Sequence, residues 1–159
     1  MPPARTTRGS AGHDLAAHLV GREVRVWSDG LMQLRATESA EGLSILTLAP
    51  GEKALVPLGF RAQLPDGFEA QVRPRSGMSV KTNLVIVNAP GTVDPDYPDE
   101  WCVPVKNGGA GTLRIAHGDR IAQLVIARFE TPEFTAGVVR PVSDRAGGFG
   151  STGIRNEVR

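Results

Sequence analysis

Several acidic residues and one tyrosine are concentrated in the stretch Gly91-Thr92-Val93-Asp94-Pro95-Asp96-Tyr97-Pro98-Asp99-Glu100-Trp101. Two runs beside it, residues 84–88 and 101–105, have the length and apolar character of strands. We therefore expect these runs to form a hairpin that carries the acidic stretch. A rigid hairpin with acids at its base can serve as a functional site, whereas a solvated acidic turn is the alternative for this stretch taken alone.

The turn of this hairpin is expected at Pro98 and Asp99. Pro98 fixes its own φ near the value required at the second position of a tight turn, and Asp99 tolerates the left-handed backbone region. Because Pro98 cannot adopt a positive φ, the primed hairpin turns are excluded and a type I or type II turn remains. The rising arm would then present Asp94, Asp96 and Tyr97.

The length of 159 residues and the 40% of hydrophobic residues are typical of one globular domain. A formal net charge of +1 provides no general attraction for nucleic acid or an anionic membrane, so we expect neither as a partner. No apolar run is long enough to span a bilayer, and residues 1–10 lack the apolar centre of a signal peptide. The single cysteine, Cys102, excludes an intrachain disulfide and fits a reducing cytoplasm.

The three histidines, His13, His18 and His117, do not have the spacing of a metal-binding helix. A cysteine-based zinc site is excluded because there is only one cysteine. Any metal is therefore expected to be a hard cation such as Mg²⁺, held by carboxylates and by oxygen atoms of the substrate.

Short strand-like runs separated by proline and glycine predict an all-β sandwich or barrel. Residues 23–27 and 31–34 alternate around Asp29-Gly30, which predicts a surface hairpin. The apolar residues of this hairpin face either the core or a neighbouring subunit. Further strands are expected at residues 46–50, 53–57, 59–64, 68–72 and 113–115.

A basic bend is expected after the strand at residues 68–72. Pro74 and Gly77 should end that strand and turn the chain, with Arg75 and Ser76 at the bend. An arginine forms a forked pair with phosphate oxygens, and a serine hydroxyl or a backbone amide can contact a bridging oxygen. The bend is thus a candidate anion site, with a basic surface loop as the alternative.

Two further segments have polar features that suggest a role in binding. Gln123 lies in a nearly continuous apolar strand, where its amide either satisfies buried backbone groups or faces a polar site. Residues 143–153 contain Arg145, Phe149 and several glycines, so we expect a mobile tail. Glycine amides can wrap an anion and Phe149 can stack on a flat ring, although a linker is the alternative.

Taken together and in this order, five segments resemble the five motifs of the homotrimeric dUTP diphosphatase (dUTPase) family. The segments are Ser10-Ala11-Gly12-His13-Asp14-Leu15, Arg75-Ser76-Gly77-Met78-Ser79, Gly91-Thr92-Val93-Asp94-Pro95-Asp96-Tyr97, Gly118-Asp119-Arg120-Ile121-Ala122-Gln123-Leu124 and Gly147-Gly148-Phe149-Gly150-Ser151-Thr152-Gly153. Any one of these motifs alone would be weak, but five in order make coincidence improbable.

The resemblance implies an all-β, jelly-roll-like barrel in residues 1–142, with a hairpin inserted at about 18–46, and a flexible glycine-rich tail in residues 143–159 that closes over the active site. It also implies a homotrimer in which each active site is assembled from all three chains. The implied reaction is the Mg²⁺-dependent hydrolysis of dUTP to dUMP and pyrophosphate. That reaction limits uracil in DNA and supplies dUMP for dTMP synthesis.

The resemblance also implies roles for individual residues. Asp94 would be the general base that activates a water for attack on the α-phosphorus, and Tyr97 would pack under the deoxyribose and block a 2′-hydroxyl. Phe149 would lie over the uracil, and Asp14 would approach the metal through water. The residues expected to bind the substrate are Arg75, Ser76, Gly77, Asn88, Gly91, Val93, Tyr97, Gln123, Arg145, Phe149, Gly150, Ser151 and Thr152.

Three departures from the family pattern affect these expectations. Asp99 stands where the family usually has a glycine, which aspartate can replace because it reaches the same backbone region. The spacing from Arg145 to the paired glycines is one residue shorter than usual, so the role of Arg145 is the least secure. The insertion at 18–46 is longer than the usual link, and it either covers the trimer surface, contacts another protein or has no measurable effect.

Two other functions are compatible with this fold. Deamination of dCTP would require a deaminase-type glutamate in the site, and Asp94 with Tyr97 fits a diphosphatase better. A nucleotide-sensing protein without catalysis would use the 18–46 hairpin as its interface, but Asp94 and the glycine tail are both intact. Hydrolysis of dUTP is therefore the preferred interpretation.

Overall fold

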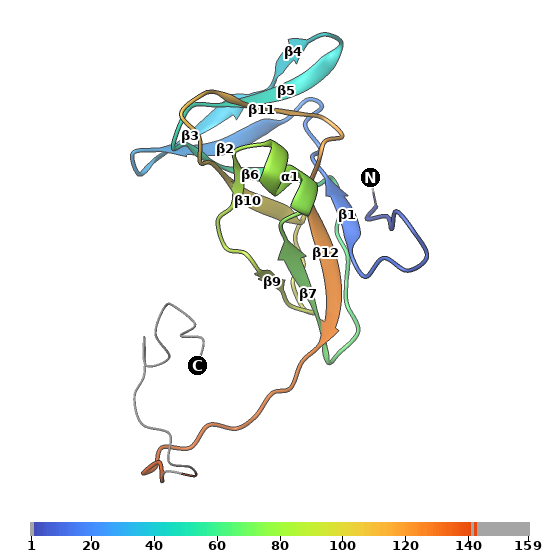
Figure 1. Cartoon of the computed structure of the whole chain (residues 1–159), viewed down its shortest axis with the longest axis vertical. Helices are drawn as coiled ribbons and strands as arrows, with labels where there is room; N and C mark the ends of the chain where they lie inside the picture. Colours follow the sequence, from blue (N-terminus) through green and yellow to red (C-terminus); the bar gives the residue numbers. More distant parts are fainter. Residues whose placement is uncertain (1, 141, 143–159) are drawn as a thin grey trace, which may run out of the picture.

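The computed structural model describes residues 2–140 and 142. These residues form twelve strands and one short helix, arranged as shown in Figure 1. The elements are β1 His13–Ala16, β2 Glu23–Ser28, β3 Leu31–Ala36, β4 Glu38–Ala40, β5 Leu43–Leu48, β6 Lys53–Pro57, β7 Phe68–Arg73, α1 Ser76–Lys81, β8 Leu84–Ile86, β9 Gly91–Val93, β10 Cys102–Asn107, β11 Leu113–Ala116 and β12 Arg120–Arg128. Within the described part of the chain, no helix is long and apolar enough to cross a membrane.

The strands are distributed over three sheets. The first sheet has the order β1-β12-β7-β9, the second has the order β3-β2-β6-β10-β8, and the third has the order β11-β5-β4. All of the recorded strand pairs are antiparallel. The prediction of an all-β barrel is thus confirmed.

Strand alternation builds the core between these sheets. In β10, Val103, Val105 and Asn107 are buried while the residues between them are partly exposed. Leu46 from the third sheet and Ile121 from the first belong to the same buried cluster. Full burial of each valine or leucine side chain contributes about 1.5–3 kcal/mol, so this shared core holds the three sheets together.

The predicted hairpin around Asp29-Gly30 is confirmed, because β2 and β3 pair from Ser28↔Leu31 to Glu23↔Ala36. Asp29 and Gly30 both have positive φ, 49° and 83°, as the favoured two-residue hairpin turn requires. β2 also pairs with β6, so the hairpin extends the second sheet.

The apolar residues of the two strands of this hairpin have different environments. Val24 and Val26 of β2 are buried in the core. Leu31 and Leu34 of β3, in contrast, are 77% and 59% exposed. Only β2 therefore contributes to the core of the single chain.

The predictions for the strands around the acidic stretch are partly confirmed. β8 and β10 pair with each other, from Val105↔Ile86 to Asn107↔Leu84. The segment between them, however, contributes β9, which pairs with β7 in the other sheet. The acidic stretch therefore crosses from one sheet to the other and is not the tip of a two-stranded hairpin.

Three local predictions were wrong. The tight turn lies at residues 94–97, where the Tyr97 amide donates to the Asp94 carbonyl at 3.2 Å, because Pro95 supplies the fixed φ. Asp99 is not among the described non-glycine residues with positive φ. Residues 59–64 form no strand. Strands do lie on either side of Gly51, as predicted, and they belong to different sheets.

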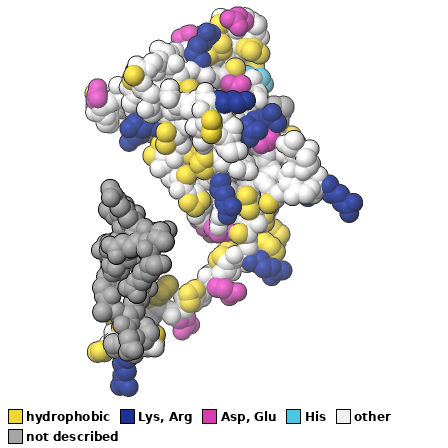
Figure 2. All heavy atoms as spheres, viewed as in Figure 1, with side chains coloured by type: hydrophobic (Ala, Val, Ile, Leu, Met, Phe, Trp, Pro, Cys, Tyr) yellow, Lys and Arg dark blue, Asp and Glu magenta, His cyan; other side chains and the backbone are white. Residues whose placement is uncertain are grey.

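The chain leaves the barrel after β12. Residues 129–140 form no strand or helix, and Figure 1 shows this segment running away from the sheets. Phe134, Val138 and Val139 are each more than 90% exposed, and hydrophobic side chains are visible along this arm in Figure 2. An extended arm with exposed apolar residues is suited to packing against another molecule.

Candidate functional site

An open pocket of about 390 Å³ lies where the N-terminal segment, the start of α1 and β12 meet. We call it the Arg75 pocket. It brings together three of the five motifs, because Asp14 belongs to the first, Arg75 begins the second and Gln123 belongs to the fourth. The lining residues are Thr6, Ser10, Ala11, Gly12, Asp14, Arg75, Ser76, Gly77 and Gln123.

The Arg75 side chain is held in place from two directions. Its Nε lies 2.7 Å from Asp14 Oδ1, and its Nη1 donates to the Arg120 carbonyl at 2.9 Å. Asp14 Oδ2 is also paired with Arg120 Nη1 at 2.9 Å. Because one carboxylate is shared by two guanidinium groups, the cluster retains a net positive charge. The pocket is therefore suited to an anion such as a phosphate.

Gln123 is fixed by a close contact with Gly12. The two strands pair so that Asp14 lies opposite Gln123. A Cβ atom placed on Gly12 would collide with the end of the Gln123 side chain, which would have to move. The Gln123 Nε2 atom donates to the Pro74 carbonyl at 2.8 Å. This glutamine therefore links the first motif to the bend that carries Arg75. Its side chain lines a polar pocket, which was one of the two alternatives predicted for it.

Ser76 and Gly77 complete the pocket at the start of α1. Arg75 is the residue before the helix and has extended backbone, with φ −94° and ψ 133°. Ser76 and Gly77 are exposed. The Ser76 hydroxyl and the first amides of the helix are donors of the kind that bind phosphate oxygens.

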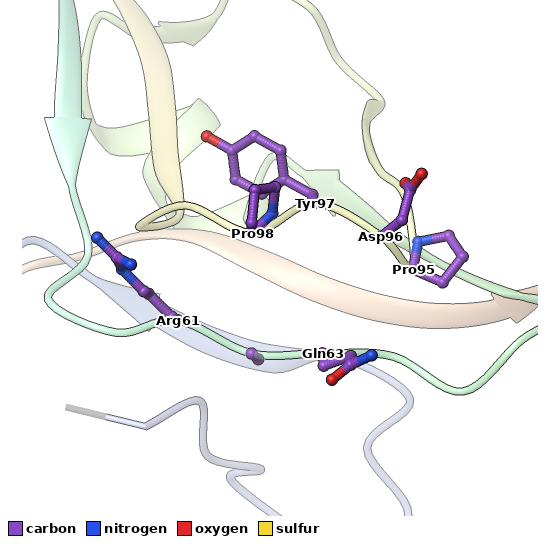
Figure 3. Close-up of a pocket in the computed structure, with 7 residues that line it drawn as sticks. Arg61, Gln63, Pro95, Asp96, Tyr97 and Pro98 are labelled. Carbon is purple, nitrogen blue, oxygen red and sulfur yellow. The ribbon is translucent and has the colours of Figure 1, made fainter.

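The acidic stretch forms a second locus, which we call the Tyr97 loop and define as residues 94–101. Tyr97 is 42% exposed, and Asp94 is also exposed. A cavity of about 340 Å³ lies beside this loop. Figure 3 shows Arg61 and Gln63 on a segment facing the part of the loop that carries Asp96 and Tyr97.

Asn88 packs against the strand that leads into the Tyr97 loop. A Cβ on Gly91 would lie 2.9 Å from Asn88 Nδ2, so the absence of a side chain at Gly91 makes room for the amide. Val93, two residues further along β9, packs against the core. Asn88, Gly91 and Val93 thus form one group at the base of the loop.

The Arg75 pocket and the Tyr97 loop lie at different places on the first sheet. Val93 pairs with Ala70, whereas Gln123 pairs with Arg73. Ala70 and Arg73 are three residues apart on β7, or about 10 Å at 3.3 Å per residue. Asp94 and Arg75 continue beyond these points in opposite directions along the strand. Asp94 and Arg75 of one chain are therefore separated by more than about 10 Å along the strand direction.

Magnesium was predicted as a cofactor, with Asp14 near it. Among the residues that the structure describes, no three His, Cys, Asp or Glu side chains converge as a metal site. The Asp14 carboxylate is also occupied by Arg75 and Arg120. An Asp14 carboxylate paired in this way does not fit a directly coordinated metal ion. A water-mediated contact of Asp14 with such an ion stays a prediction.

The predicted site residues therefore fall into three groups. Arg75, Ser76, Gly77, Gln123 and Asp14 line one pocket, whereas the group at the Tyr97 loop lies elsewhere on the sheet. The predicted residues outside the described part of the chain are Arg145, Phe149, Gly150, Ser151 and Thr152.

Two features of the site were not predicted. The ion pair of Arg120 with Asp14 joins residues 106 positions apart, and the contact of Gly12 with Gln123 also depends on strand pairing. The only sequence signal for either feature is their place inside the first and fourth motifs.

The fold and the two parts of the site define a β-barrel protein equipped to bind a small phosphorylated ligand. The family model described as dUTPase matches residues 42–153 of the chain. This chain belongs to the dUTPase family.

Two curated relatives show the extent of this similarity. A deoxyuridine 5′-triphosphate nucleotidohydrolase of Rhizobium rhizogenes is 43% identical over 155 residues, which cover 96% of this chain and 85% of the relative. The corresponding protein of Desulfotalea psychrophila is 42% identical over 144 residues, which cover 86% of this chain and 94% of the relative.

Solved structures have the same fold. The Staphylococcus bacteriophage 80alpha dUTPase, solved with dUpNHpp, has a TM-score of 0.73 at 26% identity and covers 97% of this chain and 92% of the phage chain. The dUTPase of Streptococcus mutans has a TM-score of 0.63 at 23% identity, with 83% and 88% of the two chains covered. These likenesses confirm the dUTPase-like barrel that the five motifs predicted.

Proposed function

We propose that this protein is a dUTP diphosphatase, which hydrolyses dUTP to dUMP and pyrophosphate. Support comes from family membership and from relatives named as deoxyuridine triphosphate nucleotidohydrolases. The structural observation that carries the proposal is the Arg75 pocket, in which a guanidinium group is fixed beside a serine hydroxyl and a glutamine amide. A dUTPase of the family has been solved with dUpNHpp, an analogue of dUTP, which supports the choice of nucleotide.

In the proposed reaction, the Asp94 carboxylate accepts a proton from a water whose oxygen attacks the α-phosphorus. The bond from the α-phosphorus to the bridging oxygen breaks, and pyrophosphate leaves. Arg75, Ser76 and Gln123 hold phosphate oxygens, which favours the reaction through positioning and charge stabilisation. Mg²⁺ bound to the triphosphate neutralises part of the substrate charge.

The Tyr97 loop and the residues at its base are proposed to bind the nucleoside. Asn88 and the backbone at Gly91 and Val93 contact uracil, while the Tyr97 ring lies under the deoxyribose and leaves no room for a 2′-hydroxyl. The position of the Asn88 amide beside Gly91 supports this assignment, because a Cβ atom at Gly91 would come within 2.9 Å of its Nδ2. A site that leaves polar groups unpaired against the wrong base can discriminate by roughly 10⁴- to 10⁵-fold.

A homotrimer with shared active sites is part of the proposal. Asp94 follows β9 and Arg75 follows β7, and the register places them beyond opposite ends of the paired segment, which supports a reacting centre assembled from more than one chain. In a trimer, the Arg75 pocket of one chain would face the Tyr97 loop of a neighbour. The exposed apolar residues Phe134, Val138 and Val139 on the arm after β12 support contacts between chains. Residues 143–159 are proposed to close the site of another subunit.

A pyrophosphate-release assay with dUTP, dTTP, dCTP and UTP, with and without Mg²⁺, tests the proposed function. We expect rapid Mg²⁺-dependent release from dUTP and little from the other three nucleotides. Such an activity would support a cytoplasmic role in limiting uracil in DNA and in supplying dUMP for dTMP synthesis. Release of ammonia from dCTP without pyrophosphate from dUTP would instead indicate a deaminase.

A further inference from the structure

The Tyr97 loop is anchored to the barrel at its C-terminal end by the backbone of the buried Trp101, and just before it by the side chain of Glu100. Among the described residues, the hydrogen bonds of residues 94–99 stay inside the loop: the Tyr97 amide donates to the Asp94 carbonyl, and the Tyr97 hydroxyl lies 3.5 Å from the Glu100 carbonyl. The Glu100 side chain is the first group along the loop that reaches the rest of the barrel. Its Oε1 atom accepts from the Gly59 amide at 2.8 Å.

The second partner of this carboxylate comes from the inserted segment. Arg22 Nη2 lies 2.9 Å from the same Glu100 Oε1 atom, and the two side chains are 38% and 25% exposed. The sequence separation is 78 residues. An insertion of otherwise unknown role thus provides a charged contact to the loop that carries Asp94 and Tyr97.

The backbone of Arg22 is fixed at the base of the β2–β3 hairpin. Its amide donates to the Leu19 carbonyl at 3.2 Å, and its carbonyl accepts from the Thr37 amide at 3.3 Å. The Thr37 hydroxyl also donates to the Leu19 carbonyl at 3.0 Å, and Leu19 is fully buried. The guanidinium group therefore extends from an anchored point, which lowers the entropy lost in pairing with Glu100.

We propose that Arg22 is a positioning residue for the active site, which acts through Glu100 to hold the Tyr97 loop in place. The inference rests on the proposed function, in which Tyr97 lies under the deoxyribose. Loosening the anchor would let the Tyr97 ring shift and would weaken the steric exclusion of a 2′-hydroxyl. The insertion would then contribute to the selection of dUTP over UTP.

The test compares Arg22→Gln with the wild type by two measurements. The first is the ratio of kcat/KM for dUTP to kcat/KM for UTP, which we expect to fall by about two- to fivefold, as the loss of one partly exposed ion pair allows. The second is hydrogen–deuterium exchange of the peptide that contains residues 94–101, which we expect to become faster. Arg22→Lys keeps the charge and should restore most of the selectivity.

The controls separate anchoring from general destabilisation. Arg25→Gln removes an exposed arginine of β2 that makes no ion pair with the described residues, and it should change neither measurement. In Glu100→Ala, which loses both the Arg22 and Gly59 contacts, the further change Arg22→Gln should have no additional effect on selectivity.

The outcomes distinguish this inference from the proposed function. If the wild type hydrolyses dUTP and Arg22→Gln keeps both its selectivity and its exchange rate, Arg22 has no positioning role. If the wild type does not hydrolyse dUTP, the proposed function fails, and the exchange measurement still decides whether Arg22 anchors the loop. Should Arg22→Gln fail to fold, Glu100→Gln replaces it, because its amide oxygen can still accept from the Gly59 amide while the ion pair with Arg22 is lost. The same loss of selectivity is then expected, and an unchanged selectivity would contradict the inference.

Discussion

At the scale of single residues, Asp94 is an exposed side chain that makes no ion pair with any residue in the described ranges. Its carboxylate is therefore available to a water molecule. The neighbouring turn fixes its direction, because the Asp94 carbonyl accepts from the Tyr97 amide across Pro95. An available carboxylate on a constrained loop has the properties that a general base requires.

We predict that Asp94→Asn loses turnover by at least about 10²- to 10⁴-fold, the usual contribution of a positioned general base. The fold should be unaffected because the side chain is exposed. The measurement is kcat for pyrophosphate release from dUTP, together with the melting temperature. Asp99→Asn makes the same change at another exposed position of the loop and should retain activity; near wild-type kcat in Asp94→Asn would remove Asp94 from the mechanism.

A second prediction concerns the contact of Gly12 with Gln123. Gly12→Ala would place a Cβ against the Gln123 side chain and displace its amide from the Pro74 carbonyl. Because small displacements of a positioning group are costly, we expect kcat/KM for dUTP to fall by about 10- to 100-fold. Gly9→Ala is the matched control, since nothing lies within 4 Å of the added atom. Equal activities of the two variants would contradict the role given to this contact.

The residues of the site could be predicted because each belongs to a short motif with its own chemistry. The guanidinium of Arg75 and the carboxylate of Asp94 are informative in any fold. What Asp14 contacts was not predictable, because its ion pairs with Arg75 and Arg120 depend on strands that are distant in sequence. No local sequence pattern predicts the ion pair of Arg22 with Glu100, which are 78 positions apart.

At the scale of elements, the inserted hairpin is joined to the barrel by a second ion pair. Arg35 of β3 makes two 2.7 Å contacts with the Glu52 carboxylate, which also accepts from the Ala49 amide at 2.8 Å. Glu52 is only 7% exposed. This cluster connects the hairpin edge to the turn between β5 and β6.

We predict that Glu52→Gln lowers the free energy of unfolding by about 1–3 kcal/mol, because buried donors lose a charged acceptor. The melting temperature should fall at fixed protein concentration. Glu23→Gln, an exposed change in the same hairpin, should leave it unchanged. An unaltered melting temperature in Glu52→Gln would show that the ion pair does not stabilise the hairpin.

The same cluster predicts a dependence of stability on pH. The hydrogen bond from Arg35 holds the pKa of Glu52 below its ordinary value of 4.5. The unfolded chain therefore binds a proton before the folded protein does, so the stabilisation is complete above pH 4.5 and is lost as the pH falls through the folded-state pKa. The difference in melting temperature between wild type and Glu52→Gln should shrink over that acidic range. A constant difference down to the pH of unfolding would contradict this assignment.

Strand positions were largely predictable from alternation and turn residues, as the β2–β3 hairpin shows. Which strands pair with each other was not predictable. The acidic stretch was expected to join two paired strands, but the β9 strand within this region pairs with β7, and its Val93 packs against the core. Pairing depends on the packing of the whole barrel, which a local pattern does not record.

At the scale of the whole molecule, the arm formed by residues 129–140 extends the chain away from its own barrel. The five motifs predicted a trimer and a closing tail, and both stay predictions. The separation of Asp94 from Arg75 along the first sheet is an independent argument for the trimer. No pattern in the sequence expresses that distance.

Deleting residues 147–159 should leave assembly intact and lower kcat/KM for dUTP by roughly 10- to 1,000-fold, because contacts with the phosphates are lost. Size-exclusion chromatography with light scattering and the pyrophosphate assay measure the two effects. Deleting only residues 154–159 spares the fifth motif and should retain activity. Full turnover by the longer deletion would show that the tail is a linker.

The central claim is that one active site takes Asp94 from one chain and Arg75 from another. Mixing subunits that carry Asp94→Asn with subunits that carry Arg75→Ala tests it most directly, by co-refolding equal amounts and measuring pyrophosphate release from dUTP. Each variant alone should be nearly inactive. Random assortment in a closed ring of three restores about a quarter of the sites, so the mixture should regain about a quarter of wild-type activity. A mixed preparation that assembles but stays as inactive as its two components would place both residues in one chain's site and contradict the account.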